Sequence, residues 1–352
     1  MRRDEITEAE LREVAELNDR HEGNISQISK ETGFARSTVR RRLDKAKLAG
    51  LVDHTREPIY DSPDLPSDEM DTEALVDHIT RRAETAQAAA DSRDWVPIKI
   101  KIPGPVGIVW MGDPHIDDVP GCDWPTLRRH IETVQSNPAM IVACLGDVSN
   151  NWVGKLQHLW AATEVSDRQQ WQLVEWLFDQ LRGKLALLVK GNHDLWSGAG
   201  DPLNYIKAAS TYSAEWAARV EFRFPKGEPF KVWAAHDMPG HSQYWPLHAQ
   251  QKRAKFTGYV ADLLISGHRH TWGWAKFEDD FSNRVYHVAR AKGYKQLDDY
   301  AVRLGHGSQK YGHSIVSVYD PLAPPNSRVL LFDDVELASD WLDFRRAAYA
   351  EP

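Results

Sequence analysis

Five short polar motifs constrain this chain more than any other feature of its 352 residues. In chain order they are Asp113-Pro114-His115, Gly146-Asp147, Gly191-Asn192-His193-Asp194, His236 and Gly267-His268-Arg269-His270. Each motif follows a short apolar stretch that is typical of a buried strand. These stretches are Val106–Met111, Ile141–Leu145, Leu185–Val189, Val232–Ala235 and Leu263–Ile265. Because strands of an α/β sheet present their carboxyl ends at one edge, we expect the Asp, Asn and His side chains to converge there.

Helical patterns separate these strands and set the fold class. The clearest cover Trp124–Gln135 and Val165–Leu181, and the second carries apolar residues at helical spacing. Strands that alternate with helices predict an α/β domain with helices outside a central sheet. Shorter strand patterns follow at Arg284–Ala289, Ser314–Tyr319 and Arg328–Phe332, before a final helix near Val335–Tyr349.

Composition divides the chain into three regions. Residues 1–56 are charged and helical in pattern, residues 57–94 form an acidic, proline-bearing linker and a helix over Thr72–Ala90, and residues 95–352 carry the motifs. The two cysteines, Cys122 and Cys144, predict no disulfide partner and fit a reducing compartment. No stretch approaches the roughly 20 apolar residues of a membrane helix, and the first residues lack a leader pattern. We therefore expect a cytoplasmic protein without a membrane partner.

The side chains of the motifs are those that hold catalytic metal ions. A phosphate ester resists attack by hydroxide because its oxygens are anionic, and two cations about 3.5–4 Å apart remove that barrier. Such a pair needs a bridging carboxylate and further oxygen and nitrogen ligands, which the motifs supply without a thiolate. This ligand set suits Mn, Fe, Co or Zn and favours a two-metal hydrolase.

Taken together, Asp-x-His, Gly-Asp, Gly-Asn-His-Asp, a later single His and Gly-His-x-His resemble the calcineurin-like metallophosphoesterase superfamily. The resemblance covers approximately residues 106–272 and implies that superfamily's four-layered α/β/β/α sandwich. It implies a first metal on Asp113, His115 and His270, a second on Asn192, His236 and His268, and Asp147 as the bridge. It also implies His193 near the leaving-group oxygen, as an acid or transition-state stabiliser, with Asp194 to orient it.

Two positions depart from the superfamily's pattern. Residue 237 is Asp where Gly is more common, so His236 is the least secure ligand and His241 is its alternative. The segment after Asp147 continues as Val148-Ser149-Asn150-Asn151 and lacks the Asp-Arg-Gly extension of Ser/Thr protein phosphatases. The second departure argues against a phosphoprotein substrate.

The first 56 residues resemble a helix-turn-helix domain, possibly winged after Ala49. Helical patterns cover Thr7–His21, Ile25–Thr32 and Ala35–Leu48, with Gly33 at the turn and apolar Val39 six positions later. The third helix is strongly basic, and its groove-facing candidates are Arg36, Ser37, Thr38, Arg40 and Arg41. The alternatives are a solvated face and a docking surface for a protein.

These features together predict a manganese-dependent DNA nuclease with two divalent metal ions. A helix-turn-helix joined to this catalytic domain resembles phosphoesterases of phages and prophages, which places the protein in a bacterial or phage-infected host cytoplasm. Tryptophans near the motifs are candidates for base stacking: Trp152, Trp196, Trp245, Trp272 and Trp274. Two basic clusters are candidates for backbone contacts: Lys252-Arg253-Lys255 and Arg290-Lys292-Lys295.

Two other functions stay open from the sequence. One is a phosphatase or phosphodiesterase of small nucleotides that the N-terminal domain only localises. The other is a DNA-binding regulator with an inactive phosphoesterase domain. About 80 residues follow the last motif, so we expect no capping domain and no partner ATPase. A homo-oligomer is compatible with the sequence, which does not define the oligomeric state.

Overall fold

The structure is a computed structural model of the whole chain. It describes residues 6–21, 23–52, 72–91, 95–118, 121–151, 165–196, 203, 210–257, 260–280, 282–296 and 310–350. The described residues form two compact units, residues 1–81 and 82–352, and the division falls within helix α4 (Thr72–Asp91). The predicted wing lies outside the described residues, because residues 53–71, which follow Val52, are not among them.

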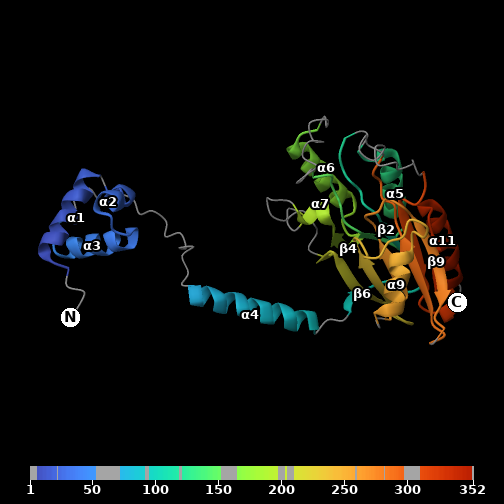
Figure 1. Ribbon diagram of the computed structural model, residues 1–352. Helices are drawn as coiled ribbons and strands as arrows, with labels where there is room; N and C mark the ends of the chain where they lie inside the picture. The colour runs from blue at the N-terminus through green and yellow to red at the C-terminus, as the bar shows by residue number, and fades with distance from the viewer. Residues whose placement is uncertain are drawn as a thin grey trace. The chain divides into compact units, whose positions relative to one another are not determined.

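The first unit is built from α1 (Glu8–Arg20), α2 (Ile25–Thr32) and α3 (Arg36–Leu48) (Figure 1). Thr7 caps α1 in a capping box with Glu10, and Gly33 ends α2 in the left-handed conformation at φ 69°. The helices share one apolar core of Val14, Leu17, Ile28, Val39 and Leu43. The three helical segments expected from the sequence are confirmed.

The second unit contains two six-stranded sheets. One sheet has the order β12-β11-β2-β3-β4-β5 and the other the order β1-β6-β7-β8-β10-β9. In the first sheet the strands are β2 (Val106–Met111), β3 (Met140–Cys144), β4 (Leu185–Lys190), β5 (Tyr212–Glu215), β11 (Ser314–Tyr319) and β12 (Val329–Phe332). In the second sheet they are β1 (Val96–Lys99), β6 (Ala217–Arg223), β7 (Phe230–Ala235), β8 (Leu263–Ser266), β9 (Gly273–Glu278) and β10 (Val285–Arg290). The strands that precede the motifs lie where the sequence predicts them.

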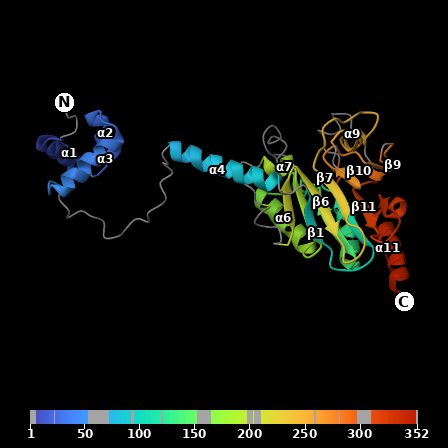
Figure 2. The same cartoon turned by 90° about the horizontal axis from the view of Figure 1, so that it is seen from below.

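The two sheets pack face to face through a buried apolar layer. Ile108 and Trp110 of the first sheet contact this layer together with Val220, Val232 and Ile265 of the second. On the outer face of the first sheet lie α5 (Trp124–Ser136), α6 (Asp167–Gln180) and α11 (Val335–Ala350) (Figures 1 and 2). On the outer face of the second sheet lies α9 (His248–Phe256). The architecture is therefore the α/β/β/α sandwich that the resemblance implied.

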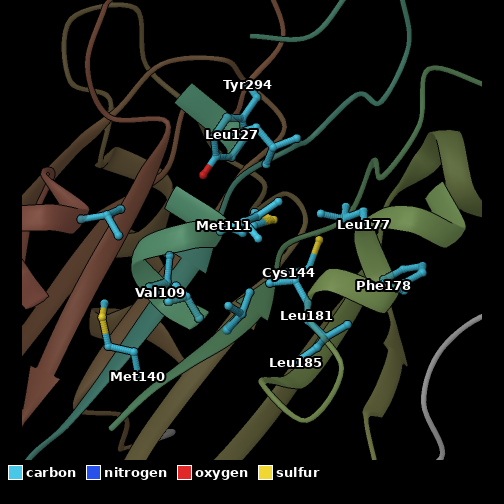
Figure 3. Close-up of a cluster of buried hydrophobic side chains, with 14 of the residues drawn as sticks. Val109, Met111, Leu127, Met140, Cys144, Leu177, Phe178, Leu181, Leu185 and Tyr294 are labelled. Carbon is cyan, nitrogen blue, oxygen red and sulfur yellow. The ribbon is translucent and has the colours of Figure 1, made fainter. Parts of the chain in front are cut away.

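The helix layer on the first sheet is held by a large apolar cluster (Figure 3). Val109 and Met111 of β2 contact this cluster with Leu127 of α5 and Leu177 and Phe178 of α6, all of them almost fully buried. Each helix places one apolar stripe on the sheet, which fixes the strand ends against a rigid backing. The loops that carry the motifs begin at these supported strand ends.

The alternation of strands and helices predicted one central sheet, and that prediction is wrong in detail. The chain passes from β5 at the edge of one sheet to β6 of the other through the single residue Trp216. No local pattern marks such a crossing, because the sheet that each strand joins depends on partners elsewhere in the chain, β4 for β5 and β1 for β6. Cys122 and Cys144 are both buried and free. No described helix is both long enough and apolar enough to cross a bilayer.

Candidate metal centre

The polar motifs converge at the carboxyl ends of β2, β3, β4, β7 and β8, where they bring two groups of ligand-type atoms together. Asp113, His115 and His270 form one group, in which one ligand atom of each residue lies within 4.8 Å of the others. Asp147, His236 and His268 form the other by the same measure. Asp147 lies between them, because its Oδ2 is 3.2 Å from His236 Nε2 and 3.9 Å from His115 Nε2. That is the position a bridging carboxylate needs.

Asn192 belongs with the second group. The Nε2 atom of His236 lies 3.1 Å from Asn192 Oδ1, 3.2 Å from Asp147 Oδ2 and 3.0 Å from His268 Nδ1. Lone pairs that point at one small volume repel one another unless a cation or proton lies among them. His236 is fully buried in this cluster, whereas His241, its alternative, is exposed and belongs to neither group.

The first group also has ligand atoms that no hydrogen bond uses. Asp113 Oδ1 and His115 Nε2 are buried and, among the described residues, have no hydrogen-bond partner. Buried polar atoms are almost always paired, so two unpaired ligand atoms in one group fit a cation bound between them. The donor set of carboxylate, imidazole and amide fits Mn, Fe, Co or Zn, and these residues therefore fit a pair of divalent cations.

The pKa values of the acidic groups also indicate that a cation would stabilise this cluster. Burial raises the pKa of Asp113 to about 8, and the Asp147 charge adds to this effect against the attraction of His236. Burial would also raise the pKa of Asp147, but the charge and hydrogen bond of His236 outweigh it and lower that pKa. The Asp147 charge in turn raises the pKa of His236 despite its burial. A proton on His236 thus offsets the carboxylate charge at the place that a divalent cation would take, because a metal ion displaces the proton from its ligands.

The remaining imidazoles are held in the neutral form that binds metals. Burial is the first cause in each case, and it lowers the pKa of His270 to about 3, that of His268 to about 4, and that of His115 well below its ordinary value. The Nδ1 atom of His270 lies 3.1 Å from the Lys292 carbonyl, and Nδ1 of His236 lies 2.8 Å from the Leu145 carbonyl. With Nδ1–H donating, Nε2 keeps its lone pair for a metal.

His115 is held by a polar chain that the sequence analysis missed. Its Nδ1 lies 2.9 Å from Asn150 Oδ1, and Asn150 Nδ2 donates to Asp117 Oδ2 at 2.7 Å. Asn150 and Asp117 are both buried. The signal for them was a polar run directly behind the Gly-Asp and Asp-x-His motifs, in a segment that follows a buried strand.

His193 and Asp194 differ in position from the expected pair. The Asp194 carboxylate accepts the backbone N–H groups of Gly191 and Asp147, both at 2.8 Å, and of Val148 at 3.1 Å. It therefore ties two motif loops together, and the expectation that it orients the His193 ring is wrong. The backbone carbonyl of Asn150 holds Nδ1 of His193 instead. The His193 ring lies 5.0 Å from the His115 ring, edge to face.

The backbone at the centre is strained. Seven described non-glycine residues have positive φ, and four of them are His115, Asp147, His268 and His270. Such conformations are unfavourable for most side chains and gather at functional sites. The glycines of the motifs allow the loops to approach: a Cβ at Gly191 would lie 2.2 Å from Asp147 Oδ1, and one at Gly267 would lie 2.3 Å from Asp113 Oδ1.

The candidate DNA contacts lie on α3 of the first unit. Arg36, Ser37, Arg40 and Arg41 are exposed, and Thr38 is half-buried. A neighbouring arginine, Arg42, instead packs inward, with its guanidinium 3.1 Å from Glu10 and 4.1 Å from the centre of the Phe34 ring. The exposed face of α3 is therefore basic, and Arg42 stabilises the bundle.

The other features proposed to contact nucleic acid divide by burial. Arg290 and Lys292 are buried, so the second basic cluster is not a surface along which a phosphate backbone can lie. Trp272 is half-buried and packs against the core between the sheets, whereas Trp196, Trp245 and Trp274 are exposed. Trp152 lies outside the described residues.

Comparisons with known proteins bear on the domain that holds the motifs. Residues 107–272 match the family model of the calcineurin-like phosphoesterases. No curated protein matches the chain. The matched stretch contains both groups of metal-binding residues and Asn192. The match supports the resemblance to calcineurin-like phosphoesterases over the part of the chain that holds the candidate metal ligands.

Proposed function

We propose that this protein is a phosphodiesterase that cleaves DNA with two divalent cations, manganese being the preferred metal. The observation that carries the proposal is the pair of ligand groups that meet at Asp147. Divalent cations at these groups would lower the pKa of bound water and offset the negative charge that grows on a phosphoryl group. Asp147, the shared ligand, would hold them at a fixed separation.

His193 supplies the remaining chemistry in this proposal. Its Nδ1–H donates to the Asn150 carbonyl, so Nε2 is the atom left to face the substrate. A protonated Nε2 would donate to the sugar oxygen as its bond to phosphorus breaks, which removes the need to expel an alkoxide. Asn150 and Asn151 would keep the ring in place, because Asn151 Nδ2 donates to the His193 carbonyl at 2.7 Å.

The choice of DNA over a small nucleotide depends on the first unit. Exposed Arg36, Arg40 and Arg41 on α3 match the phosphate backbone in charge, although the whole chain has a net charge of −8. A charge so localised supports contact with a polyanion through this unit alone. The left-handed Gly33 between the 8-residue α2 and the 13-residue α3 is also the usual arrangement of a helix-turn-helix.

A manganese-dependent hydrolysis assay tests the proposal. Purified protein is incubated with labelled single- and double-stranded DNA and, separately, with bis-p-nitrophenyl phosphate, beside the variant Asp147→Asn. We expect DNA cleavage that Asp147→Asn abolishes. Hydrolysis of the small ester with intact DNA would contradict the DNA substrate and favour a nucleotide. Absence of all hydrolysis at any metal would contradict the enzymatic function and favour the regulator.

A further inference from the structure

Trp216 lies in the connection between the two sheets, and its side chain is partly exposed to solvent. It is the single residue that joins β5 of one sheet to β6 of the other, and its φ is +58°. Its backbone N–H donates to the Lys190 carbonyl at 3.1 Å, and its carbonyl accepts the His236 N–H at 2.8 Å. A bulky residue at positive φ is rare and unfavourable. Hydrogen bonds to the ends of β4 and β7 hold it there.

The second tryptophan, Trp196, lies beside Trp216. It directly follows α7 (Asn192–Leu195), and its N–H donates to the Asn192 carbonyl at 3.0 Å. The centres of the two indole rings are 6.1 Å apart and their planes are inclined by 58°. Trp196 is 63% exposed and Trp216 is 43% exposed. Two large aromatic faces are thus open to solvent at one place, which is unusual for tryptophan.

The position of this pair decides what it can bind. Each tryptophan is one backbone hydrogen bond away from a candidate ligand of the second metal, Trp196 from Asn192 and Trp216 from His236. The backbone of both tryptophans is thus tied to the loops that carry these candidate ligands, so the pair belongs to the same edge of the sheets as the metal centre. Among the groups attached to the phosphodiester of a nucleic acid, the nucleobase is the one with an aromatic face.

We propose that Trp196 and Trp216 form a stacking platform for the unpaired nucleobase next to the scissile phosphate. The proposal rests on the proposed phosphodiesterase function and makes its substrate more specific. A base within a duplex is already stacked on its neighbours, so the platform selects single strands or frayed ends. Stacking is tolerant of sequence, and the platform therefore predicts little preference among bases.

Two phosphodiesters that share the same leaving group test the platform. Thymidine 5′-(p-nitrophenyl phosphate) and methyl p-nitrophenyl phosphate both release p-nitrophenolate, and only the first carries a base. We expect Trp196→Leu and Trp216→Leu each to raise KM for the thymidine ester by about 5- to 100-fold. The change in KM for the methyl ester, which has no base, should be much smaller. Two variants are used because the strained position 216 could affect folding by itself.

The control is Trp341→Leu on α11, where the tryptophan is 37% exposed and contacts Phe332 and Phe344 rather than the motif loops. Equal effects on both esters, or no effect on either, would overturn the platform. If the wild type hydrolyses neither ester, the proposed function fails, and fluorescence then decides the platform separately. Ten-residue oligothymidylate should quench tryptophan emission of the wild type more than that of Trp196→Leu, and equal quenching would overturn the proposal.

Discussion

At the residue scale, the glycines of the candidate metal centre lie so close to neighbouring atoms that a side chain does not fit. The nearest atom to a Cβ built on Gly191 is Asp147 Oδ1 at 2.2 Å, and His236 Cε1 follows at 2.6 Å. Gly191→Ala should therefore displace both residues and lower kcat for bis-p-nitrophenyl phosphate on the order of 100-fold. Gly273→Ala is the matched control, since its Cβ would meet only Leu247, at 3.8 Å. Full activity of Gly191→Ala would contradict the assigned ligands.

Asp237 gives a second prediction at this scale. It stands where the superfamily more often has glycine, and its carboxylate pairs with Arg269 at 2.8 Å. The pair links the residue after His236 to the residue after His268, so it holds two candidate ligands in register. Asp237→Gly should weaken manganese binding about 10- to 100-fold in calorimetry, the usual loss when a ligand's support is removed. Glu221→Ala, which removes the ion pair with Arg223 at 2.7 Å on β6, should bind manganese normally.

At the element scale, sequence predicted the strand ends and missed the connections between sheets. Val106–Met111 is buried throughout and the other apolar stretches are mostly buried, so their length and the polar residue after them mark where each strand stops. Asn150 and Trp216 were missed for a different reason. Their roles depend on partners from distant strands, His115 for Asn150 and Lys190 with His236 for Trp216. The residues next to Asn150 and Trp216 in the sequence do not indicate such contacts.

The layer between α5 and α11 gives a prediction for stability against pH. His130 of α5 is buried beside Tyr294, 2.7 Å from its hydroxyl. Burial first, and then the charge of Arg129, lowers the pKa of His130 to about 4. The unfolded chain therefore takes up a proton near pH 6.5, whereas the folded chain does so only near pH 4. The stability from this group is present above pH 6.5 and is lost as the pH falls toward 4.

The loss from His130 is at most about 3 kcal/mol. In urea unfolding at pH 7 and pH 4.5 with EDTA present, His130→Gln should lose less stability between the two pH values than the wild type. The comparison isolates His130 because the other buried histidines are the same in both proteins. An identical pH dependence of the two proteins would show that His130 is not a source of the acid sensitivity.

At the scale of the whole molecule, the two units divide the proposed work between binding and chemistry. The centre that would cleave the ester and the basic face of α3 belong to separate compact units. The affinity for DNA and the turnover of a small ester should therefore respond to different substitutions.

The variant Arg40→Ala with Arg41→Ala tests this division. Both arginines are exposed on α3, so their loss should weaken binding of a DNA duplex and reduce the salt slope of log Kd by about 2. Hydrolysis of bis-p-nitrophenyl phosphate should not change. The matched control, Arg12→Ala with Arg20→Ala, removes the same charge from α1, where both residues are exposed and paired with glutamates. Equal weakening by both variants would mean that net charge, and not the α3 face, attracts DNA. A fall in ester turnover with only the α3 variant would mean that the units do not act independently.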